Sequence, residues 1–209
     1  MTEEEIGRIR SACERLSWAR VFVFSVASAH RTLPIYHVYG WACDEVRGSD
    51  EVHAAAVGIW RVLRGKSGAS WAELGPRIEA AIREGESDLD RINNREEFGL
   101  LESLASESIS SAMFALNGCM NYSRSDLFNA AMSALEIDSI QAEEEVEREG
   151  SVEVISWNGP RGHYRQQVRD LEELSSFDES DEIQIFDRIW NRVEFEGLPF
   201  MEKMRSLIA

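Results

Sequence analysis

The sequence contains few of the residues that mark secreted or irregular proteins. Its 209 residues include three cysteines, four histidines and four prolines. Cys13, Cys43 and Cys119 lie far apart without a CxxC spacing, and an odd number of cysteines argues against a disulfide framework. Because prolines are few and no Gly/Ser-rich linker is present, we expect one domain spanning residues 1–209.

Long apolar runs are absent as well. The longest nearly uncharged stretch, VFVFSVASAH, is about half the length that a membrane helix needs. The acidic start, MTEEEIGRIR, is the reverse of a secretory or transit signal. These features, together with the scattered cysteines, predict a cytoplasmic protein that does not bind a membrane.

Short motifs for a chemical reaction are also missing. The sequence has no HExxH spacing, no glycine-rich phosphate loop followed by Lys-Ser/Thr, and no GxSxG turn. His30, His37, Cys43 and Asp44 do not follow a metal-ligand spacing. The sequence therefore predicts no metal, no cofactor and no catalytic residue. A buried carboxylate of raised pKa beside an ionised one stays possible among so many acids.

Apolar residues recur at three- and four-residue steps along most of the chain, which is typical of amphipathic helices. One example is Ile6, Ile9, Cys13 and Leu16, and a second is the stripe that includes Val52, Ala55, Ile59, Trp60 and Leu63. The fold class predicted from this period is all-α, as an irregular bundle of roughly eight or nine helices.

Turn and capping residues predict where these helices begin and end. We expect a break near Pro34, a cap at Ser49, and helix ends at Gly65 and at Asn117-Gly118. Ser70 and Glu73 have the spacing of a capping box, but Pro76 favours a helix start nearer Gly75. The last part of the chain reads as two closing helices, SDEIQIFDRIWNRV and LPFMEKMRSLIA.

What the sequence has in excess is acid, concentrated in two places. The formal net charge is −16. Residues 136–153 hold eight acids against one base, Arg148, and residues 170–187 hold eight acids and no base. Nearly all of the net charge therefore lies in these two stretches. A surface of this charge disfavours nucleic acid and favours a basic protein as partner.

Two interpretations of the acidic stretches stay open. Like-charged pairs such as Glu143–Glu147 cost about 0.2–0.5 kcal/mol each, so an ordinary solvated helix face needs no functional reason. Alternatively, both stretches fold onto one side and form a docking surface for a basic protein. The residues predicted to bind such a partner are Glu143, Glu144, Glu145, Glu147, Glu149, Asp178, Glu179, Asp181 and Glu182.

A different possibility is a small-molecule pocket near the stretch PIYHVYGWA. Tyr36, His37, Tyr39 and Trp41 supply aromatic and polar groups that could line it. Aromatic residues three to five apart on a helix more often complete the edge of a core. The pocket hypothesis therefore depends on whether these side chains share a cavity.

The stretch ERLSWARVFVFSVASAHRTLPIY resembles the opening of the YjaG-like bacterial family, a helical domain of unknown function. The features that carry the resemblance are Glu14, Arg15, Leu16, Trp18, Arg31, Pro34 and Tyr36. FGLLESLASESISSAMFALNG and DLFNAAMSALEIDSI resemble the second helical pair of that family. The resemblance covers residues 10–175 and leaves 176–209 as a C-terminal helical extension. His30 departs from it, because the family has an acid there.

The resemblance implies an all-helical bacterial protein of the cytoplasm and brings no catalytic residues with it. It is looser towards the helical immunity proteins that neutralise polymorphic toxins. The expected function is thus an acidic module that sequesters a basic toxin as an immunity-type inhibitor. The alternatives are a housekeeping homo-oligomer, such as a homodimer, and the small-molecule protein or enzyme described above.

Overall fold

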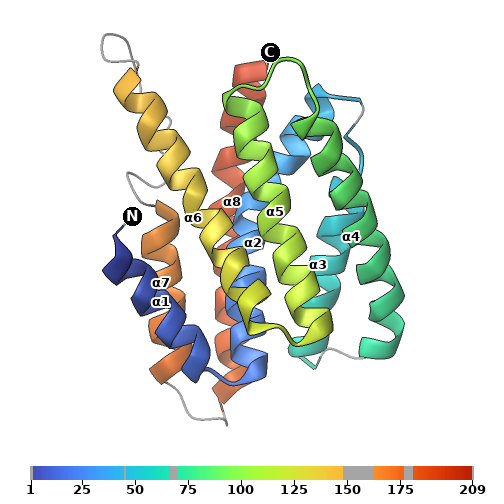
Figure 1. The fold of residues 1–209 in the computed structure, drawn as a ribbon. Coiled ribbons are helices and arrows are strands. Elements are labelled where there is room, and N and C mark those ends of the chain that lie inside the picture. Colours follow the sequence, from blue (N-terminus) through green and yellow to red (C-terminus); the bar gives the residue numbers. More distant parts are fainter. Residues whose placement is uncertain (1, 45, 66–69, 148–161, 177–180, 209) are drawn as a thin grey trace.

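The computed structural model describes the backbone of residues 2–44, 46–65, 70–147, 162–176 and 181–208, and for residues 141–147 and 197–208 it describes the backbone alone. These residues form eight helices and no strand, which confirms the all-α prediction (Figure 1). The helices are α1 (Glu3–Arg15), α2 (Trp18–Ala42), α3 (Ser49–Leu63), α4 (Trp71–Asn93), α5 (Leu100–Asn121), α6 (Arg124–Glu147), α7 (Gly162–Ser176) and α8 (Glu182–Ile208).

Helix α2 is the central element of the bundle. It packs against α3, α5, α6, α7 and α8, and most of its residues from Val21 to Tyr39 are buried. This explains why its sequence is apolar nearly all round rather than along one stripe. Within the described residues, no helix is both long enough and apolar enough to cross a membrane.

The predicted break at Pro34 is wrong, because α2 continues through it to Ala42. A proline inside a helix costs about 3 kcal/mol through its missing N–H and its crowded ring. The flanking Leu33 and Ile35 are both buried, and Ser108 of α5 donates a hydrogen bond to the carbonyl of Thr32 at 2.7 Å. Contacts with the surrounding helices therefore hold the helix together where local preference would end it.

Capping residues set several of the helix starts. Thr2 with Glu5 and Ser70 with Glu73 form capping boxes at α1 and α4, and Pro76 lies inside α4. The predicted start of this helix near Gly75 is therefore wrong, because α4 begins at Trp71. Ser49 is the first residue of α3, whose N-cap is Gly48. The predicted cap at Ser49 is therefore one residue too late, and the amide of Gly48 donates to Asp88 at 2.7 Å.

Two glycines lie inside helices. Gly85 belongs to α4 and Gly118 to α5, so the predicted helix end at Asn117-Gly118 is wrong. A Cβ at Gly85 would come within 2.5 Å of the Met113 side chain, and one at Gly118 would lie 2.9 Å from the backbone nitrogen of Leu127. These glycines allow neighbouring helices to approach closely, so they are packing residues rather than helix terminators.

Gly118→Ala should lower the free energy of unfolding by about 1–3 kcal/mol, because the added methyl group overlaps backbone that cannot rotate away. Urea unfolding followed by circular dichroism measures this change. Gly7→Ala is the matched control, since its Cβ would meet nothing within 4 Å. In that exposed helical position alanine should add about 0.5–1 kcal/mol. Equal effects of the two substitutions would contradict the close approach of α5 and α6.

The two closing helices of the prediction are one continuous helix, α8, which runs through Pro199 to Ile208. Ile185, Phe186, Ile189 and Val193 are buried in the same hydrophobic core as α2. The segment 176–209 therefore contains a helix of the main core. α7 and α8 run in opposite directions beside α2 (Figure 1).

Candidate functional site

The first acidic stretch ends α6. Glu143, Glu144, Glu145 and Glu147 lie in the last turns of this helix, which carry no basic residue. The C-terminal end of a helix bears a partial negative charge, so acidic side chains there are unfavourable by about 0.3–1 kcal/mol each. Figure 1 shows these turns standing apart from the ribbons of α5 and α8. Glu149, Asp178 and Glu179 lie outside the described residues.

The second acidic stretch is largely engaged by arginines of the same chain. Arg20 donates to Glu182 at 3.0 Å, and both side chains are partly buried. Four further carboxylates of the stretch are in ion pairs, namely Glu172 with Arg8, Asp170 with Arg31 and Arg192, Glu173 with Arg192, and Asp187 with Arg64. At least five of the eight acids in this stretch therefore have an arginine partner in the same chain.

The described ends of the two acidic stretches lie apart. The last turns of α6 and the first turn of α8 lie at opposite ends of the bundle (Figure 1). They are separated along α7, whose 15 residues make it about 22 Å long. Between these two described ends α7 reverses the chain direction, so they do not support the expectation that both stretches fold onto one side.

The carboxylate of Asp138 has a structural role at the start of α7. It accepts hydrogen bonds from the backbone amides of His163 and Tyr164 and contacts the His163 ring nitrogen at 2.8 Å. It thereby satisfies amide groups that the first turn of a helix leaves without partners. Asp138 is thus engaged within the chain, whereas Glu143, Glu144, Glu145 and Glu147 lie further along α6.

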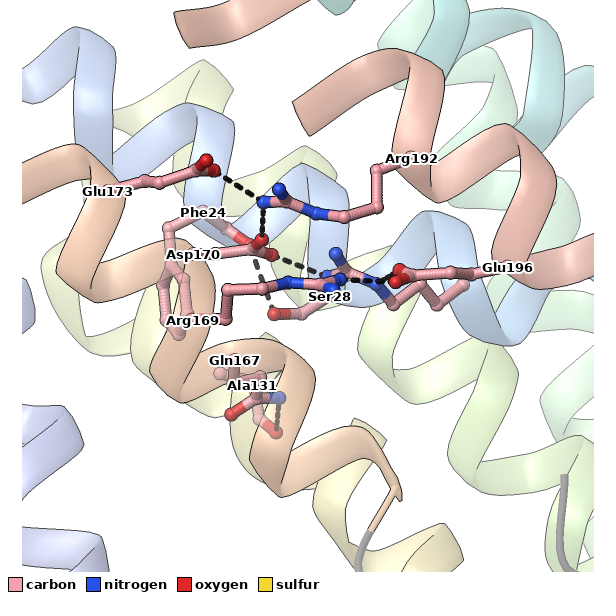
Figure 2. A network of polar contacts seen from close by, with 10 residues as sticks. Phe24, Ser28, Ala131, Gln167, Arg169, Asp170, Glu173, Arg192 and Glu196 are labelled. Carbon is pink, nitrogen blue, oxygen red and sulfur yellow. Dashed lines mark hydrogen bonds and ion pairs between the residues drawn. The ribbon is translucent and has the colours of Figure 1, made fainter. Parts of the chain in front are cut away.

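A buried network of charged side chains joins α2, α7 and α8 (Figure 2). Arg31 of α2 lies 2.6 Å from the Asp170 carboxylate of α7 and donates to Glu196 of α8 at 2.7 Å. Arg192 of α8 contacts the other oxygen of Asp170 at 2.5 Å. Arg31 and Asp170 are both fully buried.

The network is electrically balanced, since Glu173 also accepts from Arg192, and Arg169 donates to Glu196. It thus contains three cations and three anions, counting Arg31, Arg169 and Arg192 against Asp170, Glu173 and Glu196. The nearby carboxylates keep the pKa of Arg31 raised even though burial acts to lower it. This balance suits a structural connection between helices.

A second buried cluster is centred on Asp88 of α4. Its Oδ2 accepts hydrogen bonds from the Tyr36 hydroxyl at 2.5 Å and from the Gly48 amide at 2.7 Å, while Oδ1 accepts from Arg91 at 2.7 Å. Burial and the contact with Asp88 raise the pKa of Tyr36, so the hydroxyl stays protonated and donates. The cluster fixes the α2–α3 connection against α4.

The predicted pocket residues Tyr36, His37 and Tyr39 make separate polar contacts with different partners. Tyr36 bonds to Asp88, His37 contacts His53, and Tyr39 donates to Glu102 and accepts from Arg95. Trp41 is 56% exposed. A cavity of about 440 Å³ opens beside Tyr39, and its lining includes Arg95, Glu96, Glu97, Gly99 and Glu102. The aromatic pocket suggested by the sequence therefore stays a prediction.

The cysteines and metal-binding residues show no arrangement for chemistry in the part of the chain that the structure describes. Cys13, Cys43 and Cys119 are buried and free. Burial raises the pKa of Cys13 to about 12 and raises that of Cys119 further, so both thiols stay protonated at neutral pH. Among the described side chains, no three histidine, cysteine, aspartate or glutamate residues converge as a metal site.

Sequence reasoning missed Arg31, Asp88 and Asp170. One signal for Arg31 was present, because it is a lone charge following a long uncharged run of a helix, and a buried charge needs a partner. Its partners could not be read from the sequence, since Glu196 lies 165 residues away.

Comparison with known proteins adds a fold but no function. No family model and no curated protein matches the sequence. The crystal structure of a DUF416 family protein from Shewanella baltica OS155 matches with a TM-score of 0.51 and 14% identity, over 95% of this chain and 92% of that one. At this identity the likeness shows the fold alone. Because it covers 95% of the chain, it extends beyond residue 175. The resemblance to the YjaG-like family stays a prediction.

Proposed function

We propose that this protein is a protein-binding module that holds a basic partner through the acidic end of α6. The observation that carries the proposal is the position of Glu143, Glu144, Glu145 and Glu147 at the negative end of a helix dipole. In its specific form, the module is an immunity-type inhibitor that sequesters a basic toxin.

The electrostatic cost of these glutamates supports the proposal. Like-charged neighbours one turn apart are unfavourable, and so is the position of each acid at the end of the helix. A solvated face selected for stability would carry Lys or Arg in these turns, but the last turn of α6 has none. Acids kept at such a position are consistent with selection for binding a cation.

The second acidic stretch contributes little to this surface. Glu182 is bound to Arg20 and Asp170 to Arg31, so a partner would have to displace an existing arginine to use either acid. The proposal accordingly rests on α6 and not on Asp181 or Glu182. A concentrated patch of this kind speeds the capture of a basic protein by about ten- to a thousandfold at low salt.

The partner to test is a cognate toxin encoded by the adjacent gene, and replacing Glu144, Glu145 and Glu147 with lysine should weaken binding to it at least tenfold. The binding partner would be expressed and purified, and affinity measured by calorimetry at several salt concentrations. The association rate of the wild-type protein should fall steeply with salt, and the dependence should be much weaker for the triple variant.

The matched control is the triple replacement of Glu79, Glu86 and Asp90 with lysine on the exposed side of α4. It changes the net charge by the same amount at another place. Unchanged binding by the α6 variant, or equal losses in both variants, would reject the α6 surface. Failure of the adjacent gene product to bind the wild-type protein would reject the inhibitor function.

Self-association is the second candidate, because several large apolar side chains are exposed. Phe195 of α8 is 73% exposed, and Trp41, Phe98, Tyr122 and Ile183 are each at least half exposed. Such residues are common at interfaces between copies of one chain. Light scattering at micromolar concentration measures the molar mass in solution. A monomer under these conditions would reject self-association.

A further inference from the structure

Three of the four histidines lie in series between α2, α3 and α8. His30 and His37 lie two turns apart on α2, and His53 of α3 lies between them, with ring centroids 5.1 Å from His30 and 5.3 Å from His37. Nε2 of His37 and Nδ1 of His53 are 3.2 Å apart. One of these two nitrogens carries a proton and donates it, and the other accepts, so a single proton lies between the two facing nitrogens.

The inner end of the series is buried against α8. The His30 ring contacts the Trp190 ring edge-on at 5.2 Å, and Trp190 in turn contacts Trp60 of α3 at 5.2 Å. Nδ1 of His30 is buried and has no hydrogen-bond partner among the described residues. A charged imidazole here would have neither water nor an anion in direct contact, which is strongly unfavourable.

Few charged groups face the three rings. They are Arg31 from α2, Asp50 from α3 and Glu194 from α8. Asp50 lies 3.7 Å from His37 Nδ1, but its side chain is almost fully exposed, so its attraction is screened by water. Arg31 repels a proton on His30. The surroundings therefore favour the neutral form of the cluster.

We propose that His30, His37 and His53 form an acid-sensitive latch that holds α3 against α2 and α8. When both His37 and His53 are protonated, their facing nitrogens are both donors, and the hydrogen bond between them is lost. The two like charges then repel across the α2–α3 contact. Release of α3 lets water reach His30, which accepts a proton in turn.

The direction of the pH effect follows from the protonation states. Burial lowers the pKa of His30 to about 3 and also lowers the pKa values of His37 and His53 from the ordinary 6.5. The unfolded chain therefore binds more protons than the folded one below pH 6.5. Stability is fully present above that pH and is lost as the pH falls from 6.5 towards the folded-state values.

The unfolding equilibrium constant should rise by up to tenfold per pH unit for each titrating histidine between pH 6.5 and 5.5. Urea unfolding at closely spaced pH values measures this slope, in a range where most carboxylates stay ionised. In the His37→Gln/His53→Gln variant the slope should fall to at most tenfold per pH unit, the contribution of His30. His163→Gln is the matched control, because it removes the fourth histidine and should keep the cluster's response.

Hydrogen exchange distinguishes a local latch from a uniform loss of stability. On acidification to pH 5.5, the protection factors of the α3 amides should fall before those of α5 and α6, and this difference should vanish in the double variant. If the double variant does not fold at pH 8, each single variant is tested in its place. An unchanged slope in these variants, or exchange that accelerates evenly along the bundle, would overturn the latch.

Discussion

Asp170→Asn should lower the free energy of unfolding by about 3–5 kcal/mol, which is the usual cost of removing one partner from a buried ion pair. Asp170 is fully buried between Arg31 and Arg192. Asparagine keeps the shape but removes the charge, so the buried Arg31 guanidinium is left with Glu196 alone. Guanidinium chloride unfolding followed by circular dichroism measures the loss.

An exposed pair on the same helix supplies the control. Glu172 of α7 pairs with Arg8 at 3.0 Å, but these side chains are 65% and 59% exposed. Glu172→Gln removes the same charge two residues away and should cost less than about 1 kcal/mol. A similar small effect of both substitutions would show that Asp170 is not in the buried environment described here.

A double substitution separates the cost of an unpaired charge from the value of the pair. Arg31→Met/Asp170→Leu removes both buried charges, while Arg192 keeps Glu173 and Glu196 keeps Arg169. Because apolar side chains of similar size often replace a buried pair without loss, this variant should be more stable than Asp170→Asn. The two substitutions should therefore be strongly non-additive.

The helices could be predicted from the sequence, but several of their ends could not. Apolar periodicity identified the helices because each has a face that must be buried. The wrong ends involve Pro34 and Gly118, where contacts from other helices override the local preference. Such contacts join residues far apart in the chain, and one sequence does not reveal them.

For the candidate site, too, the sequence revealed local features but not contacts between distant residues. Counting acids placed Glu143, Glu144, Glu145 and Glu147 on one helix because they are neighbours in the sequence, and their binding role stays a prediction. The count could not show that Glu182 is paired with Arg20, because these residues are 162 positions apart. Charge patterning thus predicts a binding surface only for acids whose partners are also local.

Asp88→Ala should lower the free energy of unfolding by about 3–6 kcal/mol, mainly through the loss of two buried hydrogen bonds, because the third bond goes to the half-exposed Arg91. Each bond to a charged group contributes about 1.5–3 kcal/mol, and a buried group left without a partner adds to the cost. The Tyr36 hydroxyl and the Gly48 amide would both lose their acceptor. Urea unfolding measures the loss, and hydrogen exchange at Gly48 should accelerate with it.

Two conservative variants test whether the hydrogen bonds, rather than the volume of Asp88, carry this effect. Asp88→Asn keeps an oxygen for Tyr36 and Gly48 and loses the contact with the half-exposed Arg91, so it should cost about 1 kcal/mol. Tyr36→Phe removes one donor and leaves Asp88 with Gly48 and Arg91, so its cost should fall between the other two. Equal losses for Asp88→Asn and Asp88→Ala would mean that the negative charge itself, and not its acceptor geometry, holds the α2–α3 connection on α4.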